Sequence, residues 1–126
     1  MAKSSMDFSF NKIRWDLYVM EQNMVCKKFN VEIVPLEQFA IVGLADERGD
    51  ITFNALRHPQ DNYSGWFLWL GKWSDGKDFF RPVHACHLME TKPQIIKYLG
   101  LPPGYRILID DQGYEDVWFD ESLLSV

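Results

Sequence analysis

Cysteines and long apolar runs are scarce in this 126-residue sequence. Its two cysteines, Cys26 and Cys86, lie sixty residues apart. The first ten residues hold one lysine and no apolar run, which does not fit a secretory signal, so we expect a cytoplasmic protein with reduced thiols. The longest apolar stretches, 39–45 and 65–70, are far shorter than the ~20 residues that a membrane-spanning helix needs. We therefore expect neither a disulfide nor a membrane partner.

The signatures of several common enzyme classes are also missing. The sequence contains no Walker sequence, no Gly-x-Gly-x-x-Gly, no His-Glu-x-x-His and no Gly-x-Ser-x-Gly. Nucleotide-dependent, zinc-protease and serine-hydrolase mechanisms therefore have no support. We expect a protein that is not an enzyme and that needs no cofactor.

The one local cluster of metal-capable side chains is His84, Cys86 and His87. In a helix the two histidines share a face while Cys86 points away, and only a lone Cys26 or His58 remains to complete a tetrahedral set. A thiol beside two histidines also suggests an activated nucleophile, but no glycine-rich oxyanion turn surrounds Cys86. We expect no metal site here, and a catalytic thiol stays the alternative.

Positive charge is missing from the end of the chain. The net charge is −5, and six acidic residues but no lysine or arginine follow Arg106; they are Asp110, Asp111, Glu115, Asp116, Asp120 and Glu121. An acidic surface repels phosphate backbones, so we expect no nucleic-acid partner. Either this surface serves solubility alone, or Asp110, Asp111, Glu115 and Asp116 attract a basic protein partner.

Apolar spacing predicts one long amphipathic helix over residues 12–29, which ends near Asn30. Its apolar stripe consists of Ile13, Leu17, Met20 and Met24, widened by Val25 and Phe29. Lys27 and Lys28 suit the C-terminal end of a helix. Residues 1–11 are expected to form a flexible N-terminal segment.

The rest of the chain favours short strands. We predict strands at 31–34, 39–45, 51–53, 65–73, 105–109 and 117–119, and short helices at 84–90 and 93–99. Residues 39–45 and 51–53 are predicted to form a hairpin around Arg48-Gly49-Asp50, and the last two strands another around 110–113. Without βαβ alternation, these elements indicate one α+β domain over 1–126: a mostly antiparallel sheet of five to six strands packed on two to three helices.

The strand at 65–73 is apolar on both faces. Alternation places Trp66, Leu68 and Leu70 on one face, and Phe67, Trp69 and Trp73 on the other. Tryptophan is enriched in interface hot spots. Because three indole rings are hard to bury together, Trp66, Trp69 and Trp73 are our candidates for contacting a partner.

Four polar residues, Arg57, His58, Asp78 and His84, are the remaining candidates. They are expected to form a buried network that locks two loops against the tryptophan strand. Alternatively, Arg57, His58 and Asp78 line a cleft with Trp69 for a small ligand. We favour the structural role.

Several ordered blocks resemble one bacterial family. The blocks are Ile51-Thr-Phe-Asn-Ala-Leu-Arg-His-Pro, Ser64-Gly-Trp-Phe-Leu-Trp-Leu-Gly, Asp78-Phe-Phe-Arg-Pro-Val-His-Ala-Cys-His-Leu, Tyr98-Leu-Gly-Leu-Pro-Pro-Gly-Tyr-Arg-Ile-Leu-Ile and Tyr114-Glu-Asp-Val-Trp-Phe-Asp-Glu-Ser-Leu-Leu. They are similar to the immunity-protein-thirty-three-like domains of polymorphic toxin systems, over about residues 22 to 124. The resemblance implies a cytoplasmic protein that binds and neutralises a cognate toxin. It implies no catalytic residues, and the toxin and the oligomeric state stay open.

Overall fold

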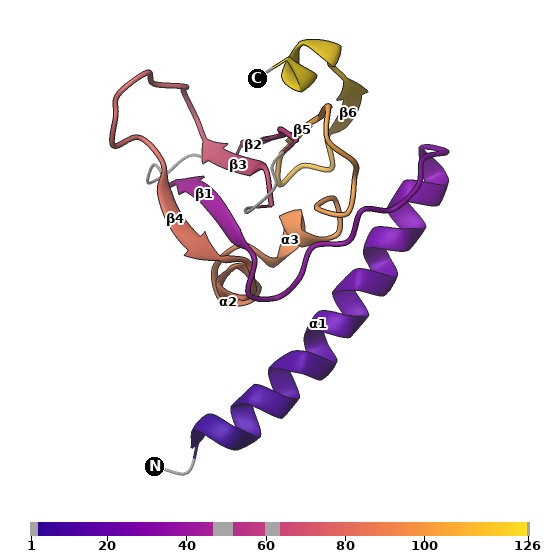
Figure 1. Ribbon diagram of the computed structural model, residues 1–126, viewed down its shortest axis with the longest axis vertical. Helices are drawn as coiled ribbons and strands as arrows, with labels where there is room; N and C mark the ends of the chain where they lie inside the picture. Colours follow the sequence, from indigo (N-terminus) through magenta and orange to yellow (C-terminus); the bar gives the residue numbers. More distant parts are fainter. Residues whose placement is uncertain (1–2, 47–51, 60–63, 126) are drawn as a thin grey trace.

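A six-stranded sheet with helices on one side forms the body of the protein (Figure 1). The structure is a computed structural model that describes residues 3–46, 52–59 and 64–125, with side chains from residue 12 onward. Its helices are α1 (Lys3–Lys28), α2 (Leu88–Thr91) and α3 (Pro93–Ile96), with 3-10 turns η1 (Ala85–His87) and η2 (Glu121–Leu124). Its strands are β1 (Ile41–Ala45), β2 (Phe53–Arg57), β3 (Trp66–Leu70), β4 (Arg81–His84), β5 (Tyr105–Ile109) and β6 (Glu115–Phe119).

The strand order is β4-β1-β3-β2-β5-β6. The β1–β3 pair is parallel and the other four pairs are antiparallel. The predicted α+β class with a mostly antiparallel sheet is therefore confirmed. The predicted β5–β6 hairpin is confirmed as well, with Ile109 opposite Glu115 beside the turn.

The predicted hairpin between 39–45 and 51–53 is wrong, because β3 lies between β1 and β2. Phe53 pairs with Leu70 on one side and with Ile109 on the other. A strand that is apolar on both faces is most stable inside a sheet, and β3 takes that place between β1 and β2. The tip at 48–50 lies outside the described residues.

Two further strand assignments differ from the sequence prediction. Residues 31–34 form no strand; instead the Val34 N–H donates to Gly100 O at 2.8 Å. Strand β4, which contains Pro82, is not among the predicted strands, and its last residue His84 was predicted to lie in a helix. The strand lies at the edge of the sheet, where proline is tolerated because one side of the strand has no pairing neighbour.

Helix α1 packs through a different face from the one that we predicted. Trp15, Gln22 and Cys26 are buried, whereas the predicted stripe is exposed: Ile13 by 61%, Leu17 by 57%, Met20 by 63% and Met24 by 69%. The buried face is held by donors that reach carbonyls of other segments. Trp15 Nε1 donates to Leu36 O at 2.8 Å and Gln22 Nε2 to Ile96 O at 3.2 Å.

The helix also begins earlier, at Lys3, and so includes most of the segment expected to be flexible. It ends before Asn30, whose φ of 58° is in the left-handed region that stops a helix. No helix among the described residues is long and apolar enough to span a membrane.

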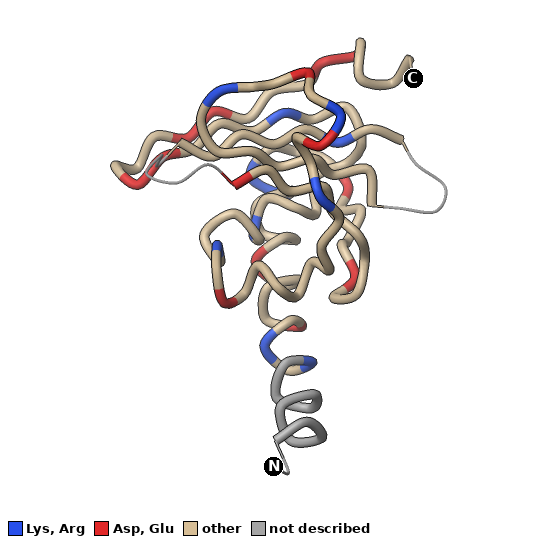
Figure 2. Tube along the Cα trace, turned by 90° about the vertical axis from the view of Figure 1, so that its left-hand side faces the viewer, with Lys and Arg blue, Asp and Glu red and all other residues tan. Residues whose placement is uncertain are grey.

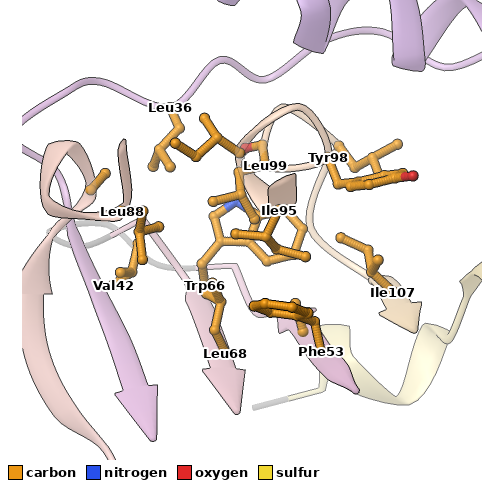
Figure 3. Packing of buried hydrophobic residues seen from close by; sticks show 14 of the residues in the cluster. Leu36, Val42, Phe53, Trp66, Leu68, Leu88, Ile95, Tyr98, Leu99 and Ile107 are labelled. Atoms are coloured by element: carbon orange, nitrogen blue, oxygen red, sulfur yellow. Dashed lines mark hydrogen bonds between the residues drawn. The ribbon is translucent and has the colours of Figure 1, made fainter. Parts of the chain in front are cut away.

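The main core lies between the sheet and the helices, around Trp66 (Figure 3). The Trp66 ring is fully buried, and its Nε1 donates to Leu99 O at 2.9 Å. Leu68 follows it on the same face of β3, and Ile95 and Leu99 pack from the α3 side. This core fixes one face of the sheet against the helices and leaves the other face for a second, smaller cluster.

Candidate functional site

The face of the sheet that points away from the helices is the candidate site. Strand alternation and the pairing register place Leu56, Phe67, Trp69, Leu108, Asp116 and Trp118 on this face, which we call the open face. One row across it runs from Trp69 through Asn54 and Leu108 to Asp116. The loop at 71–80 and η2 cover part of it, since Phe79, Phe80 and Leu123 pack there.

Five aromatic rings, which we call the aromatic cluster, dominate one half of this face; they are Phe67, Trp69, Trp73, Phe79 and Phe80. The Trp69 and Trp73 rings meet edge to face with centroids 5.1 Å apart, and Trp73 lies 5.5 Å from Phe80. Phe67 completes the cluster at 5.2 Å from Phe80. Such edge-to-face pairs hold rings in fixed positions.

Trp73 is the exposed member of this cluster. It is 51% exposed, whereas Trp69 beneath it is 9% exposed. Its Nε1 donates to the Asp75 carboxylate at 2.7 Å, which orients the indole within its loop. The Trp73 ring therefore presents a large apolar surface whose orientation is fixed before any partner binds.

Beside Trp73 the surface is hollowed by about 330 Å³. The hollow is lined by Leu56, His58, Phe67, Trp73 and Phe80 together with residues 74–76. His58 is fixed in its wall, because Nδ1 lies 3.0 Å from Leu123 O and the ring packs against Phe67. The volume is at the lower end of small-molecule sites and also suits one or two side chains of a protein partner.

Trp66 does not belong to this surface. It is 1% exposed and lies in the main core on the helix side of the sheet. Of the three tryptophans proposed to contact a partner, Trp73 and the rim of Trp69 reach the open face. The alternation within β3 is as predicted from the sequence, but only the structure shows which face the helices cover.

Arg57 is a buried cation that ties three chain segments together. Its Nε donates to Ser64 O at 2.9 Å, and Nη1 donates to Val34 O and Leu101 O, each at 2.8 Å. Burial lowers the pKa of Arg57 to about 10, so the guanidinium is still charged at neutral pH. These contacts give Arg57 a structural role.

The four polar candidates do not assemble into the expected network. Arg57 and His58 are adjacent in the chain but bind separate backbone carbonyls. Asp78 is exposed in the loop after β3, and His84 is exposed on edge strand β4, where its ring meets Phe39. A hydrogen bond from a side chain to the backbone carbonyl of a distant residue leaves no pattern in the sequence. The sequence therefore suggested that the four polar side chains bind one another.

Figure 2 shows acidic residues (red) close to the end of the chain. Strand alternation sends Glu115 and Asp116 to opposite faces of the sheet. Glu115 points to the helix side, where it accepts from Lys28 Nζ and from the Tyr98 hydroxyl, each at 2.6 Å. These two hydrogen bonds lower the pKa of Glu115. Asp116 alternates to the open face and is exposed.

Asp110 and Asp111 lie in the turn between β5 and β6. The Asp110 carboxylate accepts the backbone N–H groups of Gln112 and Tyr114 at 2.8 and 2.9 Å, which makes it a turn residue. The register places Leu70, Phe53, Ile109 and Glu115 at one end of the sheet. The acidic turn and the loop that carries Trp73 therefore leave the sheet at the same end.

The cluster of His84, Cys86 and His87 shows no sign of activation. Burial raises the pKa of the Cys86 thiol, whereas a nucleophilic cysteine needs a lowered one. Both cysteines are free thiols. In the part of the chain that the structure describes, no three His, Cys, Asp or Glu side chains are grouped as metal ligands.

The chain belongs to the Imm33-like domain family, which matches residues 21–120. The resemblance of the sequence blocks is thereby confirmed. The match begins within α1 and ends just after β6, so it includes the whole sheet and both of its faces. Neither a curated protein nor a solved structure matches the sequence.

Proposed function

We propose that this protein is a cytoplasmic immunity protein that binds a cognate toxin through the open face and blocks it without catalysis. The membership in the Imm33-like domain family supports an immunity role in general. The geometry of the open face supports its use as the binding surface. Arg57 is bound to three backbone carbonyls and burial raises the pKa of the Cys86 thiol, which favours binding over catalysis.

The half-exposed Trp73 is the observation that carries this proposal. A large ring held on a rigid aromatic base loses little conformational entropy on binding, and such rings are typical interface hot spots. The hollow beside it offers a place for a side chain of the partner.

Charge favours a basic toxin. The open face carries the exposed Asp116 in the same row as Trp69, and the acidic turn at 110–111 lies at the end from which the Trp73 loop departs. Acidic groups at this end of the open face would speed encounter with a basic partner and help to orient it. The negative charges of Asp110 and Asp111 thus contribute to the electrostatic field at this end of the sheet. The Asp110 carboxylate does so while it also accepts hydrogen bonds within the turn.

The proposal is tested by co-purification of the tagged protein with the product of the gene that directly precedes its own. The same pair is then expressed in cells with and without this protein. A stable complex together with restored growth supports immunity. A neighbour that neither binds the protein nor harms the cells removes the support for a toxin partner.

A further inference from the structure

Helix α1 has two apolar faces, and the structure covers one of them. The exposed face is the stripe of Ile13, Leu17, Met20 and Met24, each more than half exposed. At 100° per residue this stripe is nearly opposite the buried face of Trp15, Gln22 and Cys26. The body therefore lies on the opposite side of α1 from the stripe, and the stripe residues are exposed. Figure 1 shows α1 running along one side of the body.

The spacing of the stripe is that of a coiled coil. Its members are separated by four, three and four residues, the alternation of a heptad repeat, in which such positions form the seam between two helices. In the sequence, Phe10 and Met6 continue the same alternation toward the N-terminus. Over these four positions the spacing also fits the 3.6-residue period of an ordinary amphipathic helix, so it is the exposure of all four side chains that marks the stripe as an interface.

We propose that this stripe is the seam of an antiparallel two-helix contact with a second copy of this chain. The four-three-four spacing reads the same in both directions, so a twofold axis brings Ile13 of each copy opposite Met24 of the other. The same axis brings Leu17 opposite Met20. Self-complementarity of this kind is what an isologous dimer interface requires.

The charges beside the seam select the antiparallel orientation. Arg14 and Glu21 follow Ile13 and Met20, so both lie on the same flank of the seam. In the antiparallel pair Arg14 of one copy faces Glu21 of the other, an attractive contact made twice. A parallel pair instead places Asp16 beside Glu21 of the other copy, where like charges repel.

This dimer is independent of the immunity role proposed above. Ile13, Leu17 and Met20 precede the part of the chain that matches the Imm33-like domain, which starts at residue 21. They also lie on the helix side of the molecule, away from the open face. A dimer through α1 therefore leaves both open faces free and carries two binding surfaces.

Sedimentation equilibrium of the full chain over a concentration series tests the proposal. For the wild type we expect the average mass to rise with concentration from 14.8 kDa toward twice that value. For Leu17→Glu we expect 14.8 kDa at every concentration. Leu124→Glu is the matched control, because Leu124 is also exposed but lies in η2 on the other side of the sheet, and it should still dimerise. Circular dichroism checks each fold, and Met20→Lys replaces Leu17→Glu if that variant unfolds.

Reversal of one charge tests the orientation. Glu21→Arg should weaken an antiparallel dimer several-fold, and Arg14→Glu in the same chain should restore it. A parallel dimer would be strengthened by Glu21→Arg, which overturns the antiparallel arrangement. A monomeric wild type at every concentration, or a Leu17→Glu variant that still dimerises, overturns the α1 seam itself, whatever the result of the toxin experiment.

Discussion

Gln22 of α1 and Gly100 after α3 approach each other so closely that position 100 has no room for a side chain. A Cβ at position 100 would lie 2.7 Å from the Cβ of Gln22, well inside van der Waals contact. Gly100 is not among the glycines with positive φ, so backbone conformation does not explain it. Its smallness is needed because α1 packs against it, where Cys26 Sγ also contacts Gly100 O at 3.4 Å.

Gly100→Ala should therefore destabilise the protein by about 1–3 kcal/mol, the usual cost of forcing an extra methyl group into a filled core. Urea unfolding followed by tryptophan fluorescence measures the difference. Gly76→Ala is the control, since a Cβ there meets only the Ser74 hydroxyl at 3.4 Å and should change stability little. Equal effects of the two substitutions would contradict the close packing of α1 on position 100.

Arg57→Lys should be strongly destabilising although it keeps the charge. Lysine cannot reproduce the planar geometry that serves Ser64 O, Val34 O and Leu101 O together, so a buried carbonyl loses its donor at a cost of about 1–3 kcal/mol. Thermal and urea unfolding measure this cost. The same exchange at the exposed Arg81 serves as control and should be nearly neutral. If Arg57→Lys left the stability unchanged, the three carbonyls would not need the hydrogen bonds of the guanidinium.

Glu115 should give the protein a pH-dependent contribution to stability. Its pKa in the folded state is below the usual value of 4.5, because Lys28 and Tyr98 donate hydrogen bonds to its ionised form. A lowered carboxylate pKa contributes stability that is present above 4.5 and is lost as the pH falls through the folded-state pKa.

The measurement is the stability of Glu115→Gln relative to wild type from pH 7 down to pH 3. We expect the variant to be less stable by about 0.5–1 kcal/mol at pH 7, a small value because the pair is largely solvated. The gap should close as the pH falls below the folded-state pKa of Glu115. Glu32→Gln, at an exposed position, should show no such trend. A gap that stays constant with pH would exclude the carboxylate as its origin.

The parts of the fold that depend only on the residue pattern within one segment could be predicted from the sequence. The apolar faces of β3 and the turn residues between β5 and β6 are local signals, and both elements are confirmed. Helix α1 was recognised, but its packing face was not, because its sequence offers two apolar faces and periodicity cannot say which one the body covers. The parallel pairing of β1 with β3 depends on competition among distant strands, which local patterns do not record.

The candidate site was predictable in part for the same reason. Trp73 was a candidate because three indole rings in 65–73 are hard to bury together, and it is indeed half exposed; its contact with a partner stays a prediction. The supposed network failed, since the partners of Arg57 are carbonyls of loops that only the tertiary fold brings together. Glu115 was grouped with Asp116 by sequence adjacency, whereas strand alternation sends them to opposite faces.

Trp73→Ala is the most direct test of the open face as the toxin-binding surface. Removal of the indole should weaken the complex by about 2 kcal/mol or more, as expected for an aromatic anchor, while circular dichroism shows that the fold is retained. Isothermal titration calorimetry with the co-purified toxin measures the loss.

Phe39→Ala is the matched control, because Phe39 is 49% exposed but lies beside α1 on the helix side. If the open face binds the toxin, this variant keeps the wild-type affinity. A complex weakened by Phe39→Ala and not by Trp73→Ala would move the binding surface to the helix side. In that case the aromatic cluster would serve to hold the 71–80 loop on the sheet, and Trp73→Ala should then lower stability and leave affinity unchanged.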